Sequence, residues 1–315
     1  MINGKKIFGG VILLFCLLFF SGCGHKDTAN LSNTEPTIIQ ENINEIEQID
    51  FESCKELELL GIVDTYDNAN EVAAFFEDQD SLDKLISFNQ QLNSQFEVYE
   101  IYMQPLQSKL YWNIDDSFLK TYNGVVIKNQ EIEIEGKNCF ISSLNSLQVN
   151  LIAYRYFFDY IGEGRGFSES DFQYKGSGKV PIILGNDYKS YYSIGDSIEL
   201  NYLQKDFVYE IIGFFEQGLK FKIGNSEHDI DRYLCVPFFS FYGDVLNDNE
   251  RMFWIRYYQE RNSSYIKVDM SDDLREEEII EVYNLKIQKI VEELKLKYST
   301  MEIIYNISSE IIYEE

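Results

Sequence analysis

The stretch SIELNYLQKDFVYEIIGFF, residues 197–215, decides the fold. Two apolar runs, 197–203 and 207–215, flank the polar segment Gln204-Lys205-Asp206. Runs of this length, rich in Ile, Tyr, Val and Phe and joined by a short polar turn, are typical of paired β-strands. We therefore expect the centre of the chain to be rich in β-structure.

Short elements separated by turn residues surround this pair on both sides. A Gly-rich turn at 162–167 and the Gly195-Asp196 turn punctuate the chain. We expect strands at 147–149, 180–184, 233–241 and 253–258, and helices at 152–160, closed by Gly162, and at 187–192.

Helical periodicity lies toward the two ends of the folded part. A helix over 273–298, capped by Ser271 or Asp272, is predicted because apolar residues recur on one of its faces. That face consists of Ile279, Tyr283, Ile287, Ile290 and Leu294. The other expected elements are helices at 71–76 and 81–93, the second capped by Asp80, and strands at 57–63, 96–103, 125–127, 132–134 and 301–305.

Because strands crowd the middle and helices the ends, we predict an α+β fold in two packed subdomains. Residues 54–162 and 246–315 are expected to form an α/β sandwich, and residues 163–245 a β-rich insertion. A signal peptide, 1–22, and a flexible polar tether, 23–53, are expected to precede them.

The N-terminus has the pattern of a lipoprotein signal. Lys5 and Lys6 precede an apolar run of 14 residues, 7–20, which is shorter than the ~20 residues that span a bilayer as a helix. The run ends in Phe20-Ser21-Gly22-Cys23, which resembles a lipobox with Phe20 in place of the usual Leu. The resemblance implies a diacylglycerol on Cys23 that anchors the chain to the outside of the bacterial cell membrane. An ordinary cleaved signal and an uncleaved anchor are the alternatives.

Three further cysteines, Cys54, Cys139 and Cys235, follow the signal and the lipobox. Among three cysteines at most one disulfide can form, and the sequence leaves their pairing open. Cys139 and Cys235 lie in apolar, strand-like runs, so we expect buried free thiols there.

The net charge and the histidine count argue against several functions. The chain has 53 acidic and 27 basic residues, a formal net charge of −26. Cleavage before Cys23 removes two lysines and no acid, which gives −28. Such a field repels phosphate backbones and disfavours nucleic-acid binding. Two histidines, His25 and His228, offer little for a metal centre or a Ser/His or Cys/His catalytic site, so we predict no enzyme and no cofactor.

The remaining polar and aromatic groups are weak candidates for sites. Residues 228–231 offer one His and two Asp, and the acidic loop 244–250 lacks the Gly and distal Glu of a calcium loop. Trp112 and Trp254 are expected in the core, with an exposed aromatic surface for a peptide or protein as the alternative. We therefore assign no catalytic, cofactor-binding or metal-binding residue.

Residues 147–237 carry three motifs in an ordered series. The first is Leu147-Gln148-Val149-Asn150, a short helix, and then Gly164-Arg165-Gly166-Phe167 with Asp171-Phe172. The second is Val180 to Gly185, followed by Gly195-Asp196-Ser197-Ile198, and the third is Phe207 to Gly213 with a later strand ending at Pro237. In this order and spacing the block resembles the MacB-like periplasmic core domain, the extracytoplasmic domain of MacB/FtsX-type ABC transporter permeases.

The resemblance implies the extracellular module of a transporter, here as a stand-alone lipoprotein. Permeases of the family flank this domain with transmembrane helices, and this sequence has neither those segments nor a nucleotide-binding G-x-x-x-x-G-K-[ST] motif. We expect the motif residues to act through backbone geometry and packing, with Arg165 paired to Asp171 across its turn. These residues are Gly164, Arg165, Gly185, Gly195, Asp196 and Gly213.

The sequence thus favours a non-enzymatic, lipid-anchored extracytoplasmic module that binds a peptide or docks on an ABC exporter. A bacteriocin or antimicrobial-peptide immunity lipoprotein is a second hypothesis, because the negative charge attracts cationic peptides. A surface hydrolase is a third, resting on the many neighbouring carboxylates. The expected partners are the membrane, through the lipid on Cys23, and an ABC transporter permease or an extracellular peptide.

Overall fold

The computed structural model describes residues 57–122, 125–126, 129–174, 178–240, 245–270, 275–305 and 307–312. All of them belong to one compact unit, Lys55–Glu315. The expected signal peptide, the lipobox with Cys23, the tether, Cys54 and the helix caps Ser271 and Asp272 lie outside the described residues.

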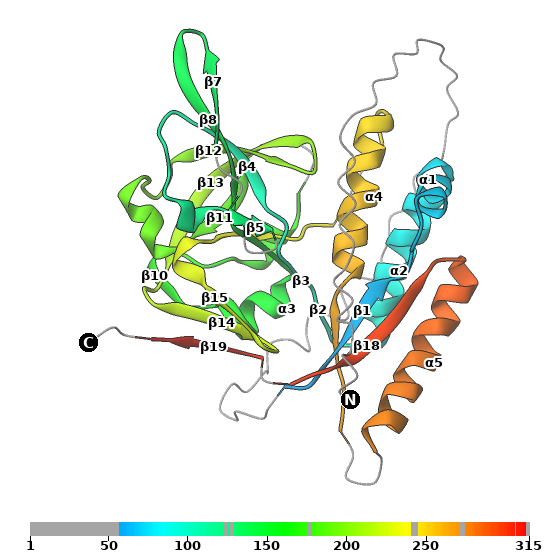
Figure 1. Cartoon of the computed structure of the whole chain (residues 1–315). Helices are drawn as coiled ribbons and strands as arrows, with labels where there is room; N and C mark the ends of the chain where they lie inside the picture. The colour runs from blue at the N-terminus through cyan, green and yellow to red at the C-terminus, as the bar shows by residue number, and fades with distance from the viewer. Residues whose placement is uncertain are drawn as a thin grey trace, which may run out of the picture. The chain divides into compact units, whose positions relative to one another are not determined.

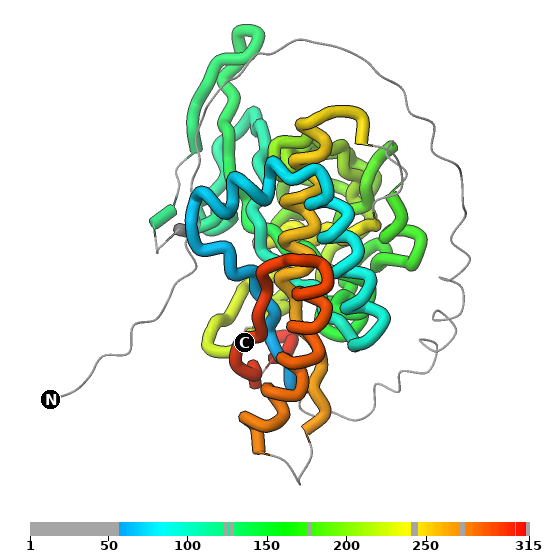
Figure 2. The backbone as a smooth tube through the Cα atoms, turned by 90° about the vertical axis from the view of Figure 1, so that its right-hand side faces the viewer, coloured from blue at the N-terminus to red at the C-terminus, as the bar shows by residue number. Residues whose placement is uncertain are grey.

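A four-stranded antiparallel sheet and four helices form the first layer. Its strand order is β18-β1-β17-β2, and α2 packs against both α4 and α5. Figure 2 shows these three helices side by side. The strands are β1 (Leu59–Asp64), β2 (Val98–Tyr99), β17 (Tyr265–Lys267) and β18 (Tyr298–Ile304), and the helices are α1 (Ala69–Glu77), α2 (Ser81–Gln95), α4 (Asp248–Asn262) and α5 (Glu276–Leu294).

A ten-stranded mixed sheet forms the second layer (Figure 1). Its order is β3-β9-β16-β11-β13-β12-β4-β8-β7, with β10 attached to β13. The strands are β3 (Ile101–Tyr102), β4 (Leu106–Leu110), β7 (Gln130–Ile134), β8 (Lys137–Leu144), β9 (Ser146–Val149), β10 (Ile161–Gly164), β11 (Val180–Leu184), β12 (Ser197–Tyr202), β13 (Lys205–Phe215) and β16 (Leu234–Pro237).

Smaller elements complete the unit. The three-stranded sheet β15-β14-β19 and the two-stranded β5-β6 stand apart from the large sheet, and helix α3 continues as a π-helical turn. These elements are β5 (Thr121–Tyr122), β6 (Val125–Val126), α3 (Leu151–Ala153), the π-turn Tyr154–Phe158, β14 (Leu219–Ile223), β15 (Ser226–Asp229) and β19 (Ser308–Ile311).

The strand pair at 197–215 is confirmed. β12 and β13 pair antiparallel from Ser197–Glu210 to Tyr202–Lys205. The chain reverses at Leu203 and Gln204, whose φ angles are +49° and +70°. β13 also pairs parallel with β11 and antiparallel with β10, so the predicted pair is the centre of the large sheet. The α+β class is confirmed as well.

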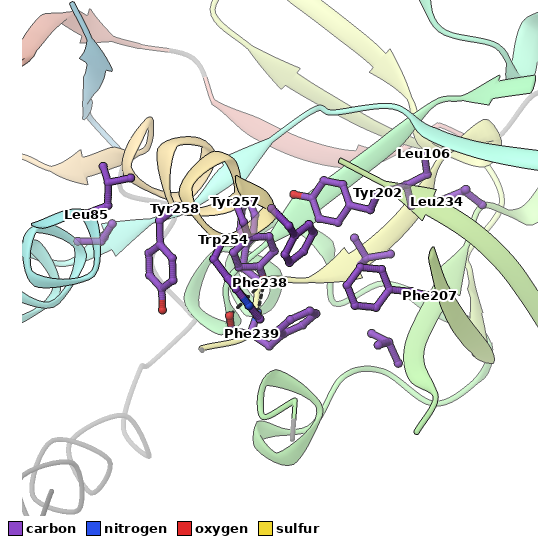
Figure 3. Close-up of a cluster of buried hydrophobic side chains, with 14 of the residues drawn as sticks. Leu85, Leu106, Tyr202, Phe207, Leu234, Phe238, Phe239, Trp254, Tyr257 and Tyr258 are labelled. Carbon is purple, nitrogen blue, oxygen red and sulfur yellow. Dashed lines mark hydrogen bonds between the residues drawn. The ribbon is translucent and has the colours of Figure 1, made fainter. Parts of the chain in front are cut away.

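Aromatic side chains fill the space between α4 and the large sheet (Figure 3). Tyr257 on α4 stacks on Phe239 with ring centroids 5.2 Å apart, and its hydroxyl lies 2.6 Å from the Phe239 backbone nitrogen. Phe253 meets Phe207 of β13 at 5.5 Å. Such ring pairs add to the free energy gained from buried apolar area, and they hold the helix against the sheet.

The expected strand at 253–258 is wrong, because these residues lie inside helix α4. Five residues of this segment are buried, so no polar face appears at a spacing of 3.6 residues. Aromatic and β-branched residues also favour strands intrinsically. The buried residues are Phe253, Trp254, Ile255, Tyr257 and Tyr258.

The expected division at residue 163 does not follow the sheets. β3, β4, β7, β8 and β9 lie within residues 101–149 yet belong to the same sheet as β11, β12 and β13. Gly162, expected to close a helix, lies within β10. The run 96–103 divides into β2 and β3, which belong to different sheets. Pairing between distant strands, which local patterns do not encode, decides these boundaries.

The residue between β2 and β3 is a fully buried carboxylate, Glu100. Arg261 of α4 donates from Nε to Glu100 Oε2 at 2.8 Å and from Nη2 to Oε1 at 3.0 Å. The Asn89 side chain of α2 donates to the same carboxylate at 2.8 Å. An ion pair to α4 and a hydrogen bond to α2 thus meet at the point where the chain passes from one sheet to the other.

A second buried carboxylate, Glu260, accepts a hydrogen bond from the Tyr202 hydroxyl of β12. Burial raises the pKa of Glu260 to about 8, because the Tyr202 hydrogen bond and the nearby Arg256 only partly offset the loss of solvent. Helix α4 therefore meets the sheet through an acid that stays protonated at neutral pH.

Glu260 should make the folded state less stable as the pH rises. The pKa of Glu260 in the folded state lies above the ordinary 4.5, so its contribution to stability is complete below pH 4.5. That contribution is lost as the pH rises through about 8. Glu260→Gln keeps an acceptor for Tyr202 but cannot ionise. As the pH rises between these limits, the free energy of unfolding of the variant in urea should increase relative to that of the wild type by on the order of a few kcal/mol.

Glu292→Gln, at an exposed position on α5, is the matched control and should leave the wild-type pH profile unchanged. If Glu260→Gln lost stability with pH as steeply as the wild type, the assignment of this dependence to Glu260 would be wrong.

Candidate functional site

Two motif glycines lie against each other where β10 pairs with β13. Gly164 pairs with Gly213 in the ladder and has a φ of +83°. A Cβ on Gly164 would lie 2.4 Å from the Ile212 carbonyl oxygen, and one on Gly213 would lie 2.5 Å from that of Arg165. The two backbones approach too closely for any side chain.

Arg165 and Asp171 form the pair expected across the turn. The guanidinium donates from Nη1 to Asp171 Oδ2 at 2.6 Å and from Nη2 to Oδ1 at 3.2 Å. The Ser168 backbone N–H donates to the same carboxylate at 2.7 Å. Burial alone would raise the pKa of Asp171, but these hydrogen bonds outweigh it and hold the pKa below its usual value. The contact shapes the chain after β10.

The remaining motif residues also engage the backbone. A Cβ on Gly185 would lie 2.2 Å from the Asp231 carbonyl oxygen. Gly195 has a φ of +89°, and its N–H donates to the Ile211 carbonyl at 2.8 Å. The Asp196 side chain accepts from the Ser193 N–H at 2.8 Å. The structure thus gathers Gly164, Arg165, Gly195 and Asp196 around residues 211–213 of β13, and Gly185 follows β11.

The polar groups at 228–231 bond to their neighbours. His228 Nδ1 lies 3.0 Å from the Tyr233 hydroxyl. Asp229 pairs with Lys220 and Arg232, at 3.3 and 3.2 Å, and Asp231 accepts from the Gly218 N–H at 2.9 Å. Among the described residues, no group of His, Cys, Asp or Glu has the arrangement to hold a metal ion.

The acidic loop expected at 244–250 is wrong for its second half, which begins helix α4. Asn247 caps this helix by accepting from the Glu250 N–H at 3.0 Å. Glu250 pairs with Lys205 at 3.1 Å, and the Lys205 ammonium lies 5.1 Å from the centre of the Phe253 ring. These acids serve the helix N-terminus and its contact with the β12–β13 turn. Asp244 lies outside the described residues.

Cys139 and Cys235 are buried free thiols, as expected. Burial raises the pKa of the Cys235 thiol, which removes the thiolate needed for nucleophilic or redox chemistry. These two cysteines are therefore packing residues.

Exposed aromatic groups gather at the end of β4. Trp254 of α4 is buried beside Phe239, as expected, but Trp112 is only half-buried and stacks on Tyr191 with ring centroids 6.1 Å apart. Tyr111 is 60% exposed and Tyr191 39% exposed. We call Tyr111, Trp112 and Tyr191 the aromatic surface. Exposed aromatic groups of this kind mark contact sites, so this is the candidate functional site.

A surface hollow lies beside the aromatic surface. Its volume is about 560 Å³, and its lining is Tyr111 with Gly136, Lys137 and Asn138 from the β7–β8 hairpin. The sequence predicted a strand at 132–134 but not the tight turn at Glu135-Gly136, where both φ angles are positive, +51° and +76°. A glycine after a run that alternates Ile with Glu was the available signal.

In the part of the chain that the structure describes, no helix is both long and apolar enough to cross a bilayer. No protein-family model matches the chain, and no curated protein is significantly similar to it in sequence. The fold is similar to the crystal structure of the extracellular domain of YknZ, a noncanonic ABC-type transporter from Gram-positive bacteria. The TM-score is 0.39 and the identity 12%, over 78% of this chain and all of that one, which is a coarse likeness of fold.

Gly195→Val should destabilise the fold by about 1–3 kcal/mol, because Val at a positive φ is strained even where space is open. Gly195→Asn should lose less stability, since Asn tolerates a positive φ better than Val does. Thermal melts of both variants beside the wild type, with partner capture from membranes in parallel, measure this. A Gly195→Val variant that melts like the wild type but captures no partner would make the turn a recognition site.

Proposed function

We propose that this chain is a non-enzymatic, lipid-anchored extracytoplasmic module that docks on an ABC exporter permease. One observation supports the proposal: the motif series in residues 147–237 resembles that of an ABC permease extracytoplasmic domain, and the strands of this block, β9, β16, β11, β13 and β12, are consecutive in one sheet. The contacts of the motif glycines support a structural use of these motifs.

The lipobox-like segment supports the proposed location. A diacylglycerol on Cys23 holds the folded part at the outer face of the membrane, where permease extracytoplasmic domains lie. The polar segment 23–53 gives it reach, since a chain of this length and composition spans roughly 30 Å. The module is thereby concentrated beside a membrane partner, which strengthens a weak contact without any new interaction.

The aromatic surface is the proposed docking point. Tyr and Trp supply large contact areas at a low cost in side-chain entropy, and they dominate protein interfaces. Trp112 is held by stacking on Tyr191, so little side-chain entropy is lost on binding.

An immunity lipoprotein that intercepts cationic antimicrobial peptides is the second candidate. The mature charge of −28 favours it, because it attracts cations at low salt. Deleting the gene should then sensitise cells to such peptides, whereas the docking function alone leaves sensitivity unchanged.

The test is cross-linking of the full chain in its native membranes, followed by identification of the captured proteins. Wild-type protein should label with palmitate and capture an ABC permease. Cys23→Ala should lose the label and remain as uncleaved precursor, because the thiol that accepts the diacylglycerol is gone. Palmitate on Cys23→Ala would contradict the anchor, and wild-type capture without any permease would contradict the docking function.

A further inference from the structure

The β7–β8 hairpin presents a sheet edge that has no neighbouring strand among the described residues. β7 ends the order of the ten-stranded sheet and pairs with β8 alone. In Figures 1 and 2 the hairpin projects beyond the rest of this sheet. An exposed edge is a template for another extended chain.

The register of the hairpin defines which backbone groups face outward. Ile134 and Lys137 flank the two-residue turn, and pairing continues through Ile132–Cys139 to Gln130–Ile141. In an antiparallel ladder bonded pairs alternate with unbonded ones, and the pair that closes a two-residue turn is bonded. The N–H and C=O groups of Glu131 and Glu133 therefore point to the open edge.

The side chains of the same two residues form an acidic row. Glu131 and Glu133 are exposed and share one face of the strand, since they are two residues apart. Neither forms an ion pair with a described residue. The lysines of the hairpin and β4, Lys137 and Lys109, lie opposite Ile134 and Ile141, on the other face, so they do not neutralise the row.

The opposite face of β7 carries two isoleucines, and Lys137 of β8 lies on the same face of the hairpin. Ile132 and Ile134 are half-buried there beside Cys139 and Ile141 of β8. The hollow lined by Tyr111, Gly136, Lys137 and Asn138 adjoins the turn. An added strand would thus meet carboxylates on one face and apolar groups on the other, with room for a side chain at its end.

We infer that β7 binds an extended cationic segment of another chain by strand addition, with basic and apolar side chains alternating along it. Basic residues lie opposite Glu131 and Glu133, and apolar residues extend the face of Ile132 and Ile134. A second copy of this chain fits worse, because antiparallel pairing about Ile132 sets Glu131 against Glu133 of the other copy. The inference rests on the proposed function and names the chemistry of the partner.

The probe is a labelled synthetic peptide in which Lys alternates with Val, titrated with the full chain by fluorescence anisotropy. A peptide of equal composition with its lysines grouped at one end should bind about tenfold more weakly. The double substitution Glu131→Lys and Glu133→Lys should weaken binding of the alternating peptide about tenfold. The control is Glu281→Lys with Glu292→Lys, which makes the same charge change at exposed positions of α5. This control should weaken binding of the alternating peptide about twofold or less.

A backbone variant separates strand addition from simple charge attraction. Glu131→Pro removes an outward N–H without a cost to the β7–β8 ladder, so it should bind about tenfold more weakly than Glu131→Ala, with equal melting temperatures. Equal binding by the two peptides, equal loss in the α5 control, or equal binding by the Pro and Ala variants would overturn the inference.

The membrane cross-linking experiment distinguishes this failure from that of the proposed function. If the Glu131→Lys, Glu133→Lys protein captures the permease as well as the wild type, the docking function stands and the β7 site is wrong. If the wild type captures no permease, the docking function itself fails.

Discussion

The arrangement of the two sheets depends on the ion pair between Glu100 and Arg261. Glu100 is fully buried at the point where the chain leaves the four-stranded sheet for the ten-stranded one. An unpaired charge there would cost several kcal/mol, so this crossover is tolerable only with its partner in place. Burial alone would lower the pKa of Arg261, but Glu100 outweighs it and raises the pKa, so the guanidinium remains charged.

The rest of the packing follows from this fixed point. With α4 held at Arg261, the aromatic residues of that helix meet Phe207 on the large sheet and Phe239 just after β16. β13 then carries three neighbours, β10, β11 and β12, and the approach of β10 is possible because Gly164 and Gly213 lack side chains. At the far end of the same sheet, β7 has no neighbouring strand on its outer side among the described residues, and it lies beside the aromatic surface. The proposed docking function thus uses the part of the sheet most distant in strand order from the structural crossover.

Local patterns predicted the elements that carry their own signal. The β12–β13 pair and helix α5 were predictable because a polar turn and a one-sided apolar face are visible within a short window. Helix α4 was not, because its aromatic residues are buried on several sides. The crossover at Glu100 was not predictable either, since it depends on a partner 161 residues away. Among the motif residues, Arg165 and Asp171 were paired correctly from their spacing. At the candidate site, Trp112 and Tyr191 meet only through the tertiary fold.

A double-mutant cycle on Glu100 and Arg261 tests the central structural claim most directly. Glu100→Leu and Arg261→Met are unfolded in urea singly and together, with emission from Trp112 and Trp254 as the readout. Each single change should lower the free energy of unfolding by about 3–5 kcal/mol, because it leaves the other buried charge unpaired. The double change should cost less than the larger of the two single changes. Additive losses, or single variants as stable as the wild type, would show that this ion pair does not hold the two sheets together.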